Sequence, residues 1–266
     1  YPAQPASQQW QLDRLHDFAT GRGITIAVID SRVDAAHPDL AGQISSSQNF
    51  AGEANRAAER HGTGVAGIIA ARANNSVGIV GVAPGARVMA LRACWERPGG
   101  GTVCDSLSIA KALSFAIDRH ANIINLSLSG PDDRLIATLI GISIARGADV
   151  IAAVDSSRKD NGFPASVPGV IAVAEKGLSP QRGHVYIAPG ADVPTTEPGG
   201  KWYLVNGSSY AAAHVSGLAA LIQQTNRANG THVATATALG TRGEINACAS
   251  LARAGSLVDG NCSLAR

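Results

Sequence analysis

Aromatic residues, methionine and long apolar runs are scarce in this chain of 266 residues. Phe, Trp and Tyr together make up 4% of the residues, and Met occurs once. No apolar run is long enough to span a bilayer, so we expect no membrane-spanning helix. The first seven residues, YPAQPAS, lack the basic and apolar parts of a signal peptide. We therefore expect either a cytosolic protein or a mature form whose export segment has been removed.

Charge of one sign is also lacking. The formal net charge is +2, and no block of Lys or Arg appears. This excludes the basic patch that binds nucleic acid or an anionic membrane, and we expect no nucleic-acid partner. Hydrophobic residues make up 45% of the chain, which is enough for a sizeable core. We expect a single domain over residues 1–266 that is monomeric.

Cysteine is rare, and its four positions form two close pairs, Cys94 with Cys104 and Cys248 with Cys262. Neither pair has the Cys-x-x-Cys spacing of a zinc site. Four cysteines allow several connectivities, and local pairing is the simplest. We expect two disulfides and an oxidising compartment, hence a secreted or periplasmic protein. The alternative is four reduced, buried cysteines in a cytosolic protein.

Strand and helix patterns alternate between residues 24 and 175. Apolar, β-branched runs occur at 24–30, 87–93, 123–128, 150–154 and 170–174, and helical spacing occurs at 61–72, 106–120 and 135–146. This order predicts an α/β fold with a mostly parallel central sheet and helices on both faces. Residues 1–20 are expected to form an N-terminal arm anchored by Trp10 and Leu12. Residues 226–266 are expected to form a less regular extension stapled by Cys248 and Cys262.

Three polar residues stand at the ends of predicted elements. Asp30 ends a strand, His61 opens a helix, and Ser209 opens a helix of small residues. A helix N-terminus suits an oxyanion and should disfavour a charged imidazole. Each residue alone fits a turn, cap or packing position. Together they are the carboxylate, imidazole and hydroxyl that nucleophilic acyl transfer requires.

The surrounding motifs carry a family resemblance. VIDS at 28–31, HGTGVAG at 61–67 and NGSSYAAAHVSG at 206–217 resemble the three signature stretches of subtilisin-like serine proteases. The connecting stretches 74–84 and 123–130 resemble that family too, so the likeness covers roughly residues 8–225. It implies a three-layer subtilisin-like fold and a serine endopeptidase that forms an acyl-enzyme intermediate.

The resemblance also implies a role for each catalytic residue. Ser209 would be the nucleophile, His61 the general base and Asp30 the group that orients the imidazole. The backbone N–H of Ser209 would be one oxyanion donor. The second donor in the family is normally an Asn, and here Asp155 stands at that position. An ionised carboxylate cannot donate, so either Asp155 is protonated or Ser156 or Asn161 replaces it.

Substrate-binding residues follow from the same resemblance. One wall of the cleft and the strand that pairs with an extended substrate would consist of Ser127, Leu128, Ser129 and Gly130. The opposing edge would contain Gly100 and Gly101, and Gly162 resembles the glycine at the floor of the specificity pocket. Peptides or proteins would then bind by strand addition. An N-terminal pro-segment is a further expected partner.

The chemistry of this family requires no cofactor, but relatives often hold a structural Ca²⁺. The corresponding ligands would be the side chains of Asp39 and Asn75, with carbonyls of Ala73, Val77 and Ile79. The alternative is a metal-free turn in which Asp39 is a cap.

Two other functions compete with proteolysis. One is a peptide- or protein-binding module whose catalysis is attenuated by Asp155 and by Arg32, which stands where the family has Gly. The other is a nucleotide-binding α/β protein, which is disfavoured because no phosphate loop follows a predicted strand.

Overall fold

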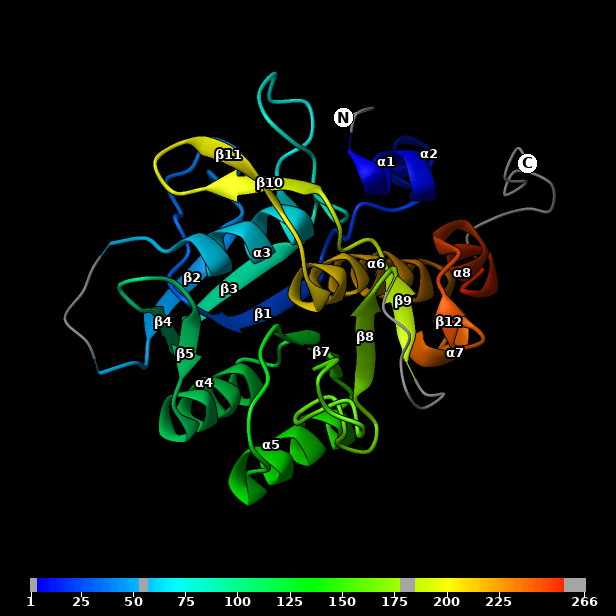
Figure 1. The fold of residues 1–266 in the computed structure, drawn as a ribbon. Helices are drawn as coiled ribbons and strands as arrows, with labels where there is room; N and C mark the ends of the chain where they lie inside the picture. The colour runs from blue at the N-terminus through cyan, green and yellow to red at the C-terminus, as the bar shows by residue number, and fades with distance from the viewer. Residues whose placement is uncertain (1–3, 53–56, 178–184, 256–266) are drawn as a thin grey trace.

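The structure is a computed structural model that describes residues 4–52, 57–177 and 185–255. Its largest sheet consists of β1 (Thr25–Asp30), β2 (Ile44–Asn49), β3 (Arg87–Arg92), β6 (Ile123–Leu126), β7 (Asp149–Ala153), β8 (Ile171–Glu175), β9 (Tyr186–Ala188) and β12 (Gly243–Glu244). These eight strands lie in the order β12-β9-β8-β7-β6-β1-β3-β2, as Figure 1 shows. Every neighbouring pair is parallel.

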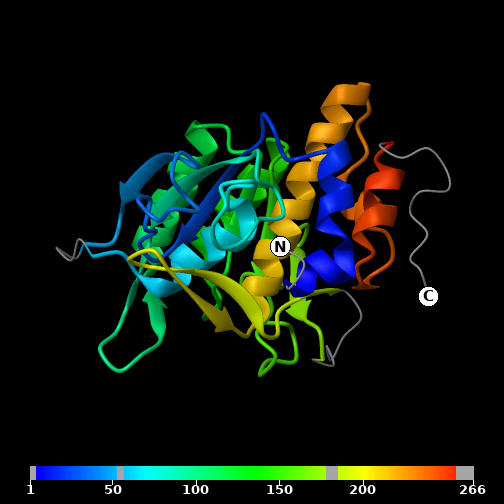
Figure 2. The same ribbon diagram turned by 90° about the horizontal axis from the view of Figure 1, so that it is seen from above.

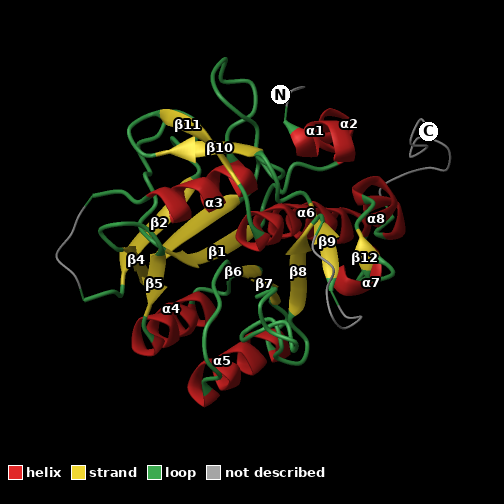
Figure 3. Ribbon diagram, viewed as in Figure 1, coloured by secondary structure: helices red, strands yellow, loops and turns green. Residues whose placement is uncertain are grey.

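Helices cover both faces of the sheet (Figures 1 and 3). One face carries α3 (Arg60–Ala70) and α6 (Ser208–Asn229), and the other carries α4 (Ser106–Asp118) and α5 (Arg134–Ala145). The apolar run of β6 is buried along its whole length because both faces of the strand are covered. The predicted fold class, a mostly parallel sheet between two helical layers, is therefore confirmed.

Small residues let the two helices of the first layer approach their neighbours closely. Ala211, Ala212 and Ala213 in α6 have no exposed surface. A Cβ at Gly217 would lie 2.5 Å from Val82 Cβ, and one at Gly67 would lie 2.3 Å from Thr196 Oγ1. Larger side chains at these glycines would push the helices away from their neighbours, so the small-residue runs set how near α3 and α6 lie to the sheet edge.

Two antiparallel hairpins complete the strands. One pairs β10 (Val193–Glu197) with β11 (Lys201–Val205), and the other pairs β4 (Cys94–Glu96) with β5 (Thr102–Cys104). Cys94 and Cys104 face each other in the second hairpin and are joined by a disulfide. This confirms the first predicted pairing. The second rests on Cys262, which lies outside the described residues, and stays a prediction.

The N-terminal arm forms two short helices, α1 (Pro5–Trp10) and α2 (Leu12–Phe18), which lie beside α6 in Figure 2. Trp10 and Leu12 are buried, as expected, and the Trp10 ring meets His214 of α6 edge-on at 5.8 Å between ring centroids. Through this contact the arm covers part of α6 that would otherwise face solvent.

The C-terminal extension is more regular than expected. The helix α6 continues to Asn229, and α7 (Thr235–Leu239), β12 and α8 (Ala247–Arg253) follow it. β12 adds to the sheet beside β9, a parallel pairing that the short Gly243–Glu244 segment does not signal by itself. Residues 256–266 lie outside the described part. Among the helices described here, none has the length and apolar character needed to cross a membrane.

Candidate active site

A cleft of about 1130 Å³ opens at the carboxyl ends of β1, β6 and β7, where α3 and α6 begin. Asp30, His61 and Ser209 all line it. The carboxyl ends of parallel strands meet at one edge of a sheet, and this edge brings together residues far apart in the sequence. Six predicted substrate-binding residues line the same cleft, namely Gly100, Gly101, Ser127, Leu128, Ser129 and Gly130.

Asp30 and His61 are directly bonded. His61 Nδ1 lies 2.7 Å from Asp30 Oδ1, and the carboxylate is 2% exposed. The backbone N–H of Ser31 donates to the same oxygen at 2.6 Å, while Ser31 Oγ accepts the N–H of Gly62 at 2.9 Å. The loop after β1 and the first turn of α3 are thereby tied together. The Nδ1 proton points at the carboxylate, which leaves Nε2 as the free base of the ring.

The electrostatic surroundings of His61 favour its charged form. Burial by itself lowers the pKa of the imidazole, but the charge and hydrogen bond of Asp30, with the charge of Glu96, outweigh burial and raise the pKa. The expected effect of the helix N-terminus is therefore outweighed by two carboxylates. The Tyr210 ring packs beside the imidazole at 5.5 Å between centroids.

Ser209 lies in the first turn of α6 and is fixed against the end of β6. Its Oγ donates to the carbonyl of Ser127 at 3.1 Å, and Ser127 Oγ donates to the carbonyl of Ser209 at 2.8 Å. Deeper in the core, Asn125 Nδ2 donates to Ser216 Oγ at 2.9 Å. The start of α6 is therefore held to the strand that carries one wall of the cleft.

Asp155 follows β7 and lines the cleft. Its Oδ1 accepts the N–H of Ser157 at 2.9 Å and the Ser157 hydroxyl at 2.6 Å, and its own N–H donates to the carbonyl of Asn161 at 2.8 Å. Gly162 has a φ of +72°, and a Cβ there would lie 2.7 Å from Asp155 Cβ. Gly162 itself does not line the cleft, whereas its neighbour Phe163 does. The glycine therefore shapes the loop rather than the pocket surface.

The two edges of the cleft are built differently. Gly130 donates its N–H to the carbonyl of Phe163 at 3.0 Å, which anchors the 127–130 segment. Gly100 and Gly101 lie at the exposed tip of the β4–β5 hairpin with φ values of 101° and 86°. Both edges leave backbone groups facing the cleft, as a groove for an extended peptide requires.

Three charged residues of the cleft carried no signal in the sequence. Glu96 Oε1 accepts the backbone N–H of His61 at 2.8 Å. Arg60 forms an ion pair with Glu197 of β10, and Glu175 ends β8 beside Ser208. All three line the cleft. Their positions depend on contacts between distant segments, and only a pairing of β4 with α3 would have pointed to Glu96.

The predicted calcium ligands do not fit a cation. Asp39 is fully buried, and its carboxylate accepts three N–H donors: Asn75 Nδ2 at 2.7 Å, the Ile79 backbone at 2.9 Å and the Trp202 indole at 2.7 Å. The Asn75 carbonyl oxygen instead accepts the N–H of Val77 at 3.3 Å. A calcium site needs several oxygens converging on one point, and here donors occupy the space around the carboxylate.

No cluster of three or more His, Cys, Asp or Glu side chains able to hold a metal occurs within residues 4–52, 57–177 and 185–255.

Comparison with known proteins places these features in a family. Residues 21–247 match the model of the subtilase family, Peptidase_S8. The chain is 38% identical over 240 residues to the thermophilic serine proteinase of Bacillus sp. (strain AK1), covering 85% of this chain and 59% of that protein. It is 36% identical over 220 residues to subtilisin E of Bacillus subtilis (strain 168), covering 76% and 56%. The chain thus spans less than two thirds of these two relatives.

Two further comparisons cover more of the matched protein. Thermitase of Thermoactinomyces vulgaris is 32% identical over 236 residues, which cover 84% of this chain and 83% of thermitase. The solved structure of the prenylagaramide maturation protease PagA shares the fold, with a TM-score of 0.77, 24% identity and coverage of 91% and 98%. With the family match extending over most of its length and this fold around the cleft, the chain belongs to the subtilase family.

Proposed function

We propose that this protein is a serine endopeptidase. Ser209 attacks the peptide carbonyl, His61 takes the hydroxyl proton and returns it to the leaving amine, and Asp30 holds the imidazole. The observation that carries the proposal is the 2.7 Å bond between His61 Nδ1 and Asp30 Oδ1, in a cleft that Ser209 also lines. Because the bond fixes the Nδ1 proton, Nε2 is the atom that accepts from Ser209.

The proton transfer requires a change at Ser209. Its hydroxyl donates to the Ser127 carbonyl, and a rotation about χ1 directs it to His61 Nε2 instead. Catalytic hydrogen bonds are often poorly aligned without substrate and tighten in the complex. An extended substrate pairing with the 127–130 segment would pack against Ser209 and favour the second rotamer.

For the oxyanion we propose two groups, the backbone N–H of Ser209 and the side chain of Asp155. The N–H groups in the first turn of α6 have no partner within the helix and suit a developing negative charge. Asp155 acts as a donor only in its protonated form. We therefore expect weaker transition-state stabilisation than an amide would give at this position.

The substrate class follows from the two cleft edges. We propose that a peptide or protein segment lies extended between the 127–130 segment and Gly100–Gly101, with main-chain hydrogen bonds on both sides. The disulfide between Cys94 and Cys104 supports an oxidising compartment, and we propose a secreted or periplasmic protein. A monomeric enzyme with an N-terminal pro-segment is part of the same proposal.

A fluorophosphonate probe and a mixed peptide library test this function. We expect the probe to label Ser209, and the protein to cut peptide bonds inside the library peptides. The Ser209→Ala variant should do neither while keeping the same thermal unfolding. A folded protein that is neither labelled nor active between about pH 5 and pH 9 would contradict the proposal.

One observation favours a second candidate, a peptide-binding module with attenuated catalysis. A carboxylate at Asp155 lines the cleft where the oxyanion would form, and an ionised form repels it. This candidate predicts that the unmodified protein binds library peptides with the same affinity as Ser209→Ala and releases them intact.

A further inference from the structure

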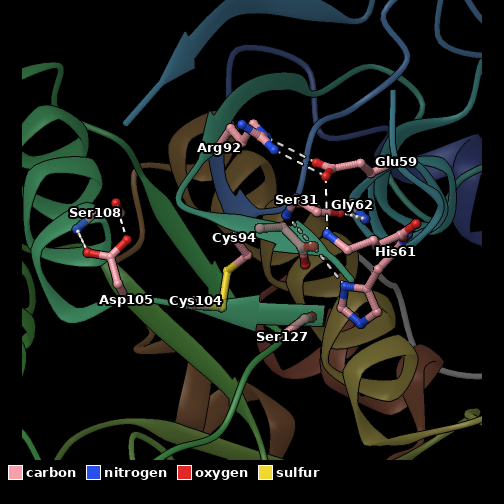
Figure 4. The surroundings of a disulfide bond; sticks show 12 residues. Ser31, Glu59, His61, Gly62, Arg92, Cys94, Cys104, Asp105, Ser108 and Ser127 are labelled. Carbon is pink, nitrogen blue, oxygen red and sulfur yellow. Dashed lines mark hydrogen bonds and ion pairs between the residues drawn. A yellow bond between two sulfur atoms is a disulfide. The ribbon is translucent and has the colours of Figure 1, made fainter. Parts of the chain in front are cut away.

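A buried carboxylate next to the catalytic helix collects hydrogen bonds from three separate segments. Glu59 is 5% exposed and immediately precedes α3. Its Oε2 accepts the backbone N–H of Arg32 at 2.6 Å and Arg92 Nε at 3.0 Å. Its Oε1 accepts Arg92 Nη2 at 3.1 Å and the backbone N–H of Glu96 at 3.1 Å. Figure 4 shows the two-pronged contact of Arg92 with Glu59 near His61 and the disulfide.

Each of these bonds leads to a group of the cleft. Arg32 lies two residues after Asp30, and Arg92 is the neighbour of Asp30 in the β1–β3 register. Glu96 lies two residues after Cys94 in the hairpin that forms one edge of the cleft. Glu59 itself lies two residues before His61. One side chain therefore joins the loop after Asp30, the start of the His61 helix and the hairpin.

Glu96 closes the arrangement into a ring. Its backbone N–H donates to Glu59, and its side-chain Oε1 accepts the N–H of His61 at 2.8 Å. The main chain of His61 is therefore held from two sides, through Arg60 to Glu59 and through Glu96. The Arg92 fork and two backbone donors keep Glu59 ionised: burial raises the pKa of its carboxyl, but the bonds from Arg92, Arg32 and Glu96 together lower it.

We propose that Glu59 is a positioning residue for the Asp30–His61 pair, which it keeps in register with the disulfide hairpin through Arg92 and Glu96. This inference rests on the proposed protease function. It assigns the buried Arg92–Glu59 ion pair to the geometry of catalysis as well as to stability. When Glu59 loses its charge, the hairpin separates from α3 and the Glu96 carboxylate moves away from His61.

The pH dependence of kcat/KM distinguishes positioning from stability. The groups that face His61 are Asp30 from β1, Glu96 from β4 and Tyr210 from α6, with Arg60 beside it on α3. Of these, Glu96 depends on Glu59 for its backbone bond. A displaced Glu96 raises the pKa of His61 less, so the acid limb of kcat/KM moves to lower pH. A loss of stability alone changes the amount of active enzyme and leaves that limb in place.

The experiment compares Glu59→Gln, Glu96→Gln and the double variant, each titrated for active sites with the fluorophosphonate. We expect Glu59→Gln to lower kcat/KM by about 10²-fold through kcat, because a misplacement of about 1 Å costs that much. The acid limb should shift down in both single variants, and the double variant should shift no further than Glu96→Gln. Asp149→Asn is the matched control, because Asp149 is also buried and hydrogen-bonded, to Gln223 and Thr235, but lies at the other end of the sheet. It should lower the melting temperature without moving the limb.

An unmoved acid limb in Glu59→Gln, or shifts that add in the double variant, would overturn the inference. Arg92→Lys keeps the charge but loses the fork, and it decides the matter if Glu59→Gln does not fold. A downward shift in that variant supports positioning, and an unmoved limb contradicts it. Failure of the protease proposal is distinguishable, because the unmodified protein would then neither bind the probe nor cut peptides.

Discussion

The substitution Asp155→Asn is expected to make this protein a faster protease. Asp155 Oδ1 is held by the N–H and hydroxyl of Ser157 at 2.9 and 2.6 Å. An Asn side chain can keep both bonds through its carbonyl oxygen. Its amide nitrogen then takes the position of Oδ2, which accepts no hydrogen bond from any residue that the structure describes. The variant would therefore present two N–H donors where the unmodified chain presents a carboxylate oxygen.

The size of the effect follows from what one oxyanion donor contributes. Removing such a donor lowers kcat by about 10²–10³-fold, or roughly 3–4 kcal/mol of transition-state stabilisation. Adding one on an unchanged loop should recover a large part of this, so we expect kcat to rise by about 10²-fold at neutral pH. KM should change little, because the oxyanion develops only in the transition state.

The assay is the hydrolysis of one peptide substrate by enzyme titrated for active sites. Asp155→Ala is the control, since it removes the charge but adds no donor and breaks the bonds to Ser157. It should gain far less than Asp155→Asn. Equal rates in the two variants would show that charge and not donation matters, and an unchanged rate in both would refute the placement of Asp155 at the oxyanion.

Three other perturbations follow from the contacts described above. Asp30→Asn should lower kcat by about 10⁴-fold with near-normal folding, because the amide favours the wrong tautomer of His61, and steady-state kinetics would expose a smaller loss. Trp202→Phe removes one donor to buried Asp39 and should lower the free energy of unfolding by about 1–3 kcal/mol, while a chelator should leave the melting temperature of the unmodified protein unchanged; a chelator-induced drop would restore the calcium site. Burial lowers the pKa of His214 from 6.5 to about 4, so the folded state resists its protonation. Stability should therefore be complete above pH 6.5 and fall by about 3 kcal/mol as pH decreases toward 4. Urea unfolding of Ser209→Ala should show this slope, which His214→Gln should reduce; an equal slope in both would place the titration elsewhere, with His16, whose pKa burial also lowers, as the next candidate.

Local patterns predicted the central strands and helices well because both faces of the sheet are covered. Runs such as 24–30 and 123–128 are apolar throughout, and the helical stretches keep an apolar spacing, so each signal is contained in one segment. The C-terminal extension was predicted less well. The two residues of β12 are strand only because β9 offers them an edge, and a segment of that length has no periodicity of its own.

The sequence by itself determined the family, the order of Asp30, His61 and Ser209, and the Cys94–Cys104 pairing, because these depend on residue types at fixed local spacings. The tertiary structure alone decided which charges surround them. Asp39 looks like a metal ligand in the sequence, yet Trp202, far along the chain, directs an N–H at its carboxylate. Glu59 and Glu96 look like surface acids, yet the ends of β1, β3 and β4 bring donors to both and connect them to His61. Hydrogen bonds act over about 3 Å in space regardless of separation in sequence, so such partners become visible only when the chain is folded.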